Sequence, residues 1–127
     1  MRWKRPNWYE EYTEFELLHQ EQDLSFDFLE DAFLAGSLEP IPKWVWCTLQ
    51  NTDSNTLFSL AEAEAWAKVH RCEENLARIV RGLVGTDVLP APIILKSLQG
   101  GRPYLVAGNC RLVACRVLNL LPDVWLM

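Results

Sequence analysis

The sequence predicts a small α+β domain, and three observations point to this class. The chain has 127 residues, the usual length of one domain. Half of the residues are hydrophobic and 23% are charged, which is the balance of an ordinary globular protein. Segments with a helical spacing of apolar residues alternate with short runs of strand-forming residues that glycine and proline interrupt. We therefore expect a small mixed sheet with helices packed on it.

We expect one compact domain, in which a helical, acidic and aromatic extension, residues 1–42, packs on a core, residues 43–127. Asn7 is placed to cap a helix that reaches about residue 22. Four apolar residues of that helix recur at helical spacing: Trp8, Tyr12, Phe15 and Leu18. Ser25 is placed to cap a second helix, which ends before Gly36.

The first half of the core is predicted to hold one strand and two helices. Two prolines precede the run 43–49, whose strand-forming residues predict a strand. The polar segment 50–56 is typical of an exposed loop. Ser59, with a glutamate three residues later, forms a capping box for a helix over 59–69. Helical spacing of apolar residues predicts a further helix over 73–83.

The second half of the core is predicted to form a hairpin, a helix and a last strand. The runs 93–96 and 104–106 are expected to be strands joined by a glycine-rich turn at 99–102. Asn109 is placed to cap the helix that follows. The apolar run 124–126 predicts the closing strand.

Charge is distributed unevenly along the chain. The formal net charge is −5, which argues against a protein that coats DNA through bulk charge. Residues 1–42 carry three basic and ten acidic side chains, whereas residues 78–116 carry six basic side chains and one acid. An anion is therefore the expected guest of the second segment.

The sequence also indicates whether a zinc site is expected and where in the cell the protein is expected to act. The four cysteines have no C-x-x-C spacing and lie apart from the two histidines, so no zinc site is expected. No apolar run approaches the roughly 18 residues of a membrane span, so we expect no membrane association. The basic start is followed by acids rather than by an apolar signal core, so a cytoplasmic protein is expected.

The junction Val106–Arg111 carries the clearest chemical signal. A predicted strand ends, Gly108 turns the chain, and a helix begins with Arg111 in its first turn. First-turn N–H groups lack intrahelical partners and attract anions. Gly108 permits a phosphate to approach closely, and Arg111 can donate two parallel hydrogen bonds to it. We therefore predict a phosphate site at Gly108, Asn109, Cys110 and Arg111, although the same pattern is also typical of an ordinary turn before a helix.

Other side chains are candidates for this site. Arg102 and Arg116 would assist in binding phosphate if they face the same pocket. Phosphoryl transfer needs a carboxylate near the attacking oxygen or on Mg²⁺. Glu39, just before the predicted strand at 43–49, is chosen as the catalytic candidate. The helix N-terminus and Arg111 are expected to lower the pKa of Cys110.

Residues 92–127 read PIILKSLQGGRPYLVAGNCRLVACRVLNLLPDVWLM. A strand that begins with Pro-Ile is followed by a glycine-rich hairpin, a strand ending in glycine, a polar residue, a variable residue and arginine. This order resembles the core of the ParB/sulfiredoxin superfamily, and the resemblance covers residues 89–127. Gly108, Asn109 and Arg111 match the family's phosphate-binding box, and Ala114 matches its small helix residue.

The resemblance implies a nucleotide-binding protein of nucleic-acid metabolism, of the kind often called a ParB-like nuclease. In relatives similar to chromosome-partitioning proteins the box holds CTP beside Mg²⁺; in those similar to sulfiredoxin and free-serine kinases it holds ATP or ADP. We therefore expect a nucleoside triphosphate, CTP or ATP, with Mg²⁺. Phosphoryl transfer and NTP hydrolysis both stay open, as does contact with DNA. Because phage genomes carry many such proteins, the expected location is the cytoplasm of a bacterium or a phage-infected bacterium.

Two departures from the family pattern favour an alternative. The partition-type box carries an acid where this chain has Asn109 and an arginine where it has Cys110. The alternative is a non-catalytic phage protein that modulates a host or DNA-processing partner. Its aromatic, acidic N-terminal region would bind that partner or a second copy of the chain, because aromatic residues are common interface anchors. The residues expected to do so are Trp8, Tyr12 and Phe15.

Overall fold

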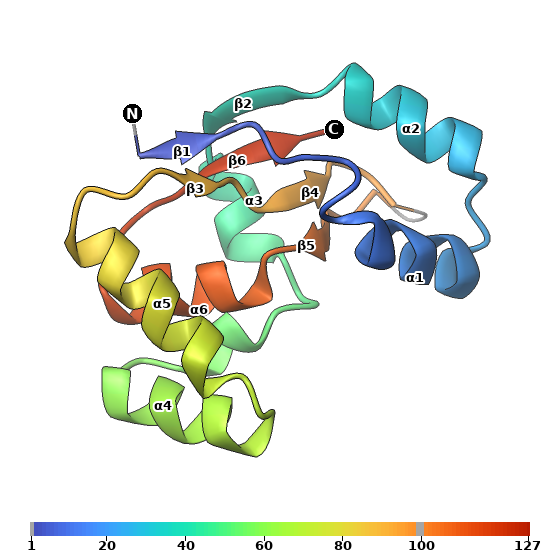
Figure 1. Ribbon diagram of the computed structural model, residues 1–127. Coiled ribbons are helices and arrows are strands. Elements are labelled where there is room, and N and C mark those ends of the chain that lie inside the picture. Colours follow the sequence, from blue (N-terminus) through green and yellow to red (C-terminus); the bar gives the residue numbers. More distant parts are fainter. Residues whose placement is uncertain (1, 99–100) are drawn as a thin grey trace.

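The computed structural model describes residues 2–98 and 101–127, and it confirms an α+β fold with a small mixed sheet (Figure 1). The helices are α1 (Tyr12–Gln22), α2 (Phe26–Leu34), α3 (Lys43–Thr48), α4 (Leu60–Val69), α5 (Glu73–Val84) and α6 (Asn109–Val117), with a short 3-10 helix η1 (Asp53–Thr56). The strands are β1 (Trp3–Lys4), β2 (Ser37–Pro40), β3 (Leu89–Pro90), β4 (Ile93–Leu95), β5 (Tyr104–Ala107) and β6 (Asp123–Leu126).

The main sheet has four strands in the order β2-β6-β4-β5. β6 is antiparallel to β2 and parallel to β4, and β4 is antiparallel to β5, so the sheet is mixed. β1 and β3 form a separate parallel pair. Both ends of the chain therefore contribute strands to the fold, and β5 is an edge strand of the main sheet.

Helices cover both faces of this sheet, and alternate residues of each strand face opposite ways. One face packs with α1 and α2 through a cluster that includes Phe15, Leu29, Ile93, Val106 and Trp125. The other face packs with α3 and α6 through Val45, Ile94, Leu105, Leu112 and Val124. α4 and α5 lie beyond α6, on the opposite side of the molecule from α1 and α2 (Figure 1).

The strand predicted at 43–49 is wrong, because this segment forms α3. Pro42 precedes the first helical residue with φ of −63°, so its fixed ring favours a helix start at this point. Ile41, Val45 and Leu49 are buried at intervals of four, which is a helical spacing. The strand propensity of the individual residues is thus outweighed by packing of one helical face against the sheet.

The extension 1–42 contains two strands that the sequence did not reveal. β1 pairs with β3, and β2 pairs with β6 at the edge of the main sheet. Pro40 is compatible with β2 because an edge strand needs fewer backbone donors than a central one. Residues 37–40 therefore belong to the sheet, so the boundary expected at 42/43 does not separate the sheet from the extension.

Two of the predicted helix caps are confirmed, and two positions differ. Ser25 and Ser59 accept backbone hydrogen bonds at the starts of α2 and α4. Asn7 instead caps a turn, and α1 begins later, after Glu11. Asn109 is the first residue of α6 rather than its cap, because Gly108 takes the cap position.

Half of the hairpin turn predicted at 99–102 lies outside the described residues.

Over the ranges 2–98 and 101–127, no helix combines the length and the apolar character that a membrane span requires.

Candidate functional site

The turn between β5 and α6 requires a glycine. Gly108 has φ of 107°, which L side chains rarely adopt. A Cβ atom added there would lie 2.8 Å from the Cβ of Pro92 and 3.3 Å from the guanidinium carbon of Arg111. The absence of a side chain therefore lets the Arg111 guanidinium lie against the backbone of the turn.

The first backbone N–H groups of α6 have no partner within the helix. The first hydrogen bond of the helix runs from Leu112 N to the carbonyl of Gly108, at 2.9 Å. No residue of the described chain accepts a hydrogen bond from the backbone N–H of Asn109, Cys110 or Arg111. These groups carry the positive end of the helix dipole, so they favour an anion.

A hollow of about 340 Å³ lies at this helix start, between α5, α6 and the segment before α1. Its polar lining includes Glu11, Glu14, Asn75, Arg78, Asn109, Cys110 and Arg111, and we call it the arginine hollow. Arg78 comes from α5, where its Nη2 donates to Asn75 Oδ1 at 2.6 Å. Two guanidinium groups from separate helices thus line one hollow.

Arg111 already has three partners on the protein. Its Nη1 donates to the backbone carbonyls of Pro90 at 2.7 Å and Ala91 at 3.2 Å. Its Nη2 forms an ion pair with Glu11 Oε1 at 3.0 Å. The predicted phosphate-binding arginine therefore also ties α6 to the β3–β4 connection and to the N-terminal segment.

Asn109 is engaged by the polar loop at 50–56 rather than free for a ligand. Its Oδ1 accepts hydrogen bonds from Thr52 Oγ1 at 2.9 Å and from the backbone N–H of Asp53 at 3.1 Å. Its Nδ2 donates to Asp53 Oδ2 at 2.9 Å. The side chain of Asn109 therefore fixes this loop against the start of α6.

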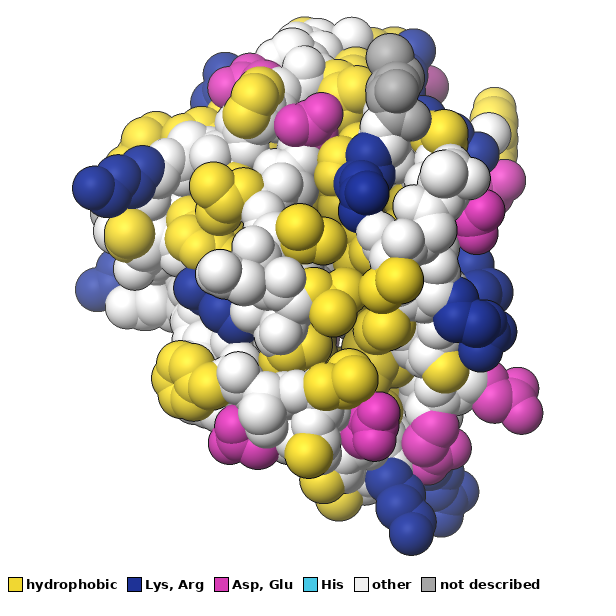
Figure 2. Space-filling model, turned by 90° about the vertical axis from the view of Figure 1, so that its left-hand side faces the viewer, with side chains coloured by type: hydrophobic (Ala, Val, Ile, Leu, Met, Phe, Trp, Pro, Cys, Tyr) yellow, Lys and Arg dark blue, Asp and Glu magenta, His cyan; other side chains and the backbone are white. Residues whose placement is uncertain are grey.

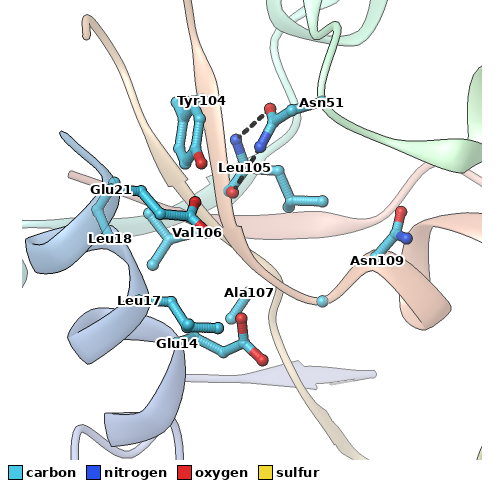
Figure 3. Close-up of a pocket in the computed structure, with 11 residues that line it drawn as sticks. Glu14, Leu17, Leu18, Glu21, Asn51, Tyr104, Leu105, Val106, Ala107 and Asn109 are labelled. Atoms are coloured by element: carbon cyan, nitrogen blue, oxygen red, sulfur yellow. Dashed lines mark hydrogen bonds between the residues drawn. The ribbon is translucent and has the colours of Figure 1, made fainter.

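A second hollow, of about 240 Å³, lies on the other side of Gly108 and Asn109, between α1 and β5 (Figure 3). Glu14 and Glu21 of α1 and Tyr104 of β5 line it, and we call it the acidic hollow. Burial and then the charge of Glu11 raise the pKa of Glu14. Burial and then the charge of Glu21 raise the pKa of Tyr104. Negative charge is thus poorly accommodated here.

Asn51 closes the edge of the sheet beside the acidic hollow. Its Nδ2 donates to the carbonyl of Leu105 at 2.9 Å, and its Oδ1 accepts from the N–H of Leu105 at 2.8 Å (Figure 3). This side-chain amide satisfies both backbone groups of a residue on the edge strand β5, as a neighbouring strand would. The polar loop therefore stabilises the exposed edge of β5 beside the acidic hollow.

The predicted lowering of the Cys110 pKa is wrong. Burial, and then the neighbouring Cys72 thiol, raise the pKa of this thiol to about 11, against smaller opposing effects of Asn75 and Arg111. At neutral pH such a thiol is almost entirely protonated, and the protonated form is a poor nucleophile. Cys115 is fully buried in the core.

Three of the predicted site residues lie away from both hollows. Arg102 is exposed and donates to Gln50 Oε1 at 2.9 Å. Arg116 lies over the ring of Trp46 at 3.8 Å from its centroid and lines a separate, smaller hollow. Glu39 lies on β2, at the opposite edge of the sheet from β5, and accepts from Ser37 at 2.7 Å. The structure brings together Gly108, Asn109, Cys110 and Arg111 only.

The aromatic residues of the extension serve mostly within the chain. Phe15 is fully buried. The half-buried Trp8 stacks on it with ring centroids 4.2 Å apart. Tyr12 is 42% exposed and Tyr9 is 85% exposed, so these two rings face solvent. Of the three aromatic residues expected to anchor a partner, Tyr12 is the exposed one.

A largely apolar groove of about 470 Å³ lies between α4 and α5. Leu60, Ala67, Leu76, Ala77 and Val80 line it, with charged side chains along its rim. Figure 2, which views this side of the molecule, shows hydrophobic side chains between charged ones in its lower half. The groove lies apart from the start of α6, and its lining has no residue in common with either hollow there.

Sequence reasoning missed two charged residues of the site. Glu11 and Arg78 lie far along the chain from Gly108, and no local motif links them to it. One weak signal was present for Arg78, since Asn75 and Arg78 are three residues apart and share a face of a predicted helix. Comparison with protein-family models, with curated proteins and with solved structures finds no match to this chain.

Proposed function

We propose that the protein binds the phosphate groups of a nucleotide at the start of α6, in the arginine hollow. One arrangement carries this proposal: Gly108, the first-turn residues of α6 whose N–H groups have no partner in the described chain, and two arginines all line one hollow. Backbone N–H groups and arginine forks are the donors that bind phosphate oxygens most strongly in proteins. The donors come from the backbone of residues 108–111 and from the side chains of Arg78 and Arg111.

The ligand that the family resemblance suggests is a nucleoside triphosphate, CTP or ATP, with Mg²⁺. The carboxylates of Glu11 and Glu14 line the same hollow, and oxygen ligands of this kind suit Mg²⁺. Among the described residues Glu14 makes no ion pair, so it is the side chain offered to an ion that arrives with the triphosphate. When bound, Mg²⁺ would offset the negative charge that the phosphates bring next to the two glutamates.

Turnover of that nucleotide, by phosphoryl transfer or hydrolysis, is a separate proposal within the same site. Glu39 lies at the far edge of the sheet, so the carboxylate that would hold Mg²⁺ or accept a proton is Glu14, which lines the arginine hollow. Action on nucleic acid in a bacterial or phage-infected cytoplasm belongs to the same proposal and rests on the resemblance of residues 89–127.

A thermal shift experiment tests nucleotide binding. CTP, ATP, GTP and UTP, each with Mg²⁺, are added to the wild type, because a ligand that binds only the folded state raises the melting temperature. We expect at least one nucleotide to raise it, and Arg78→Ala to abolish the rise. Arg81→Ala is the matched control, since Arg81 lies on the same helix but lines the α4–α5 groove. The absence of a shift with every nucleotide would contradict the proposal.

A second candidate function, an interaction with a partner protein, is favoured by one exposed region. Arg5, Asn7, Tyr9 and Leu34 line an open hollow of about 410 Å³ beside the N-terminal segment. Tyr9 is 85% exposed and Leu34 is 62% exposed, and an exposed aromatic next to an arginine is a usual interface anchor. A pull-down that depends on Tyr9 and Tyr12, but not on Arg111, would support a partner protein or a second copy of the chain.

A further inference from the structure

The ion pair between Glu11 and Arg111 is nearly closed to solvent. The two atoms are 3.0 Å apart, and the side chains of Arg111 and Glu11 are 11% and 16% exposed. It is the one ion pair among residues 2–98 and 101–127. Water screens such a pair less than it screens a surface pair, so the contact strongly affects what else Arg111 can bind.

The guanidinium of Arg111 has one fixed edge and one edge that can exchange partners. Nη1 is held by the backbone carbonyls of Pro90, the last residue of β3, and Ala91, which follows it. Nη2 is held by a carboxylate at the end of a side chain. Carboxylate and phosphate oxygens accept the same hydrogen bonds from a guanidinium, so Glu11 stands where a phosphate oxygen would bind.

Glu11 is presented to Arg111 from a fixed backbone. Its own N–H donates to the carbonyl of Asn7 at 3.1 Å, and its carbonyl accepts from Glu14 and Phe15 in the first turn of α1. Phe15 is fully buried against the sheet, so α1 is anchored beside β5, the strand that leads into α6. Rotation of the Glu11 side chain alone would release Nη2, with no change in the fold.

We propose that Glu11 is a built-in competitor that lowers the affinity of the Arg111 site for phosphate. This inference rests on the proposed function and adds its regulation: an anion binds Nη2 only by displacing the Glu11 carboxylate. Glu14 faces the same hollow, so an anion that entered without displacing Glu11 would meet two carboxylates at once. Displacement of Glu11 removes one of them from the contact.

Isothermal titration calorimetry with tripolyphosphate tests whether Glu11 competes with phosphate for Arg111, because this probe carries the phosphate charge without a base or sugar. The proteins compared are the wild type, Glu11→Gln and Glu10→Gln. Glu10 is exposed, is the adjacent residue, and carries the same charge, so its variant controls for net charge. We expect Glu11→Gln to bind about tenfold more tightly than the wild type, and Glu10→Gln less than about twofold more tightly.

The outcomes separate this inference from the function on which it rests. If Glu11→Gln and Glu10→Gln raise the affinity for tripolyphosphate equally, only long-range charge matters. That result would contradict the role of Glu11 as a competitor but would leave the proposed phosphate site intact. Binding to none of the three proteins would overturn both, since removal of a competitor must expose the site. If Glu11→Gln fails to unfold cooperatively, Glu11→Asp replaces it, because the shorter side chain keeps the charge and withdraws the carboxylate from Nη2; the expected gain is then smaller but still exceeds that of Glu10→Gln.

Discussion

The two hollows beside Gly108 share a wall and differ in charge. Both are lined by Gly108, Asn109 and Glu14. The arginine hollow adds Arg78, Arg111 and Glu11, whereas the acidic hollow adds Glu21 and Tyr104. The start of α6 therefore separates a hollow with both basic and acidic side chains from a hollow whose charged side chains are acidic.

This difference shows that charge segregated along a sequence need not stay segregated in space. The acidic extension and the basic segment 78–116 are far apart in the chain. The fold packs α1 on β5, so that Glu11 contacts Arg111 at the start of α6 and Glu14 lines both hollows. The net charge of each segment led us to expect an anion at the basic part, and it did not indicate that Glu11 and Glu14 would line the same hollow as Arg111.

The largest expected loss of stability follows a substitution at Gly108, which lies in the wall that the two hollows share. Gly108→Ala places a Cβ against Pro92 in a left-handed conformation, so we expect a loss of about 3 kcal/mol in the free energy of unfolding. The control is Gly101→Ala, where φ is 76° but no atom of the other described residues beyond its chain neighbours lies within 4 Å of the added Cβ. Strain alone should cost that variant about 1 kcal/mol. Urea unfolding measures both, and equal losses would contradict a packed wall at Gly108.

An intermediate effect is expected at the edge of the acidic hollow. Asn51→Ala removes both hydrogen bonds to the backbone of Leu105, and we expect a loss of about 2 kcal/mol in the free energy of unfolding. Gln50→Ala is the matched control, because it removes one exposed hydrogen bond to Arg102 and should cost no more than about 0.5 kcal/mol. If urea unfolding gives equal losses for the two variants, Asn51 does not act as a substitute strand.

The smallest expected effect depends on pH and comes from Glu14, on the wall between the hollows. Because the folded state raises the pKa of Glu14 above 4.5, folding favours its protonated form, and the ionised form is destabilising. Glu14→Gln should therefore be more stable than the wild type at pH 7, by less than about 1 kcal/mol because the side chain is partly screened by solvent. This gain should vanish below about pH 4, where both states of the wild type are protonated. Thermal unfolding at the two pH values checks the sign, and a wild type more stable than the variant at pH 7 would contradict it.

Much of the fold could be predicted from local signals in the sequence. The serine caps at 25 and 59, the helical spacing in α5 and the glycine before α6 each act within a few residues. The segment 43–49 could not be predicted in this way, because its strand-forming residues are overruled by packing of one helical face. β1 and β2 were missed because each is short and is defined by a partner strand far along the chain.

The candidate site was predictable in part, for the same reason. Residues 108–111 form one local turn, so sequence alone located it. Glu11, Arg78 and the loop that holds Asn109 reach this turn through tertiary contacts. The pKa of Cys110 was predicted in the wrong direction because burial, which the sequence does not display, outweighs the nearby positive charge.

Amide chemical shifts during a nucleotide titration test the central claim most directly. The ¹⁵N-labelled wild type is titrated with CTP or ATP in the presence of Mg²⁺. Binding at the start of α6 predicts that the largest shifts fall on the backbone N–H groups of residues 108–111, with smaller shifts at Arg78. Shifts confined to the α4–α5 groove or to the exposed Arg5 and Arg102 would contradict the phosphate site, as would a spectrum that neither nucleotide changes.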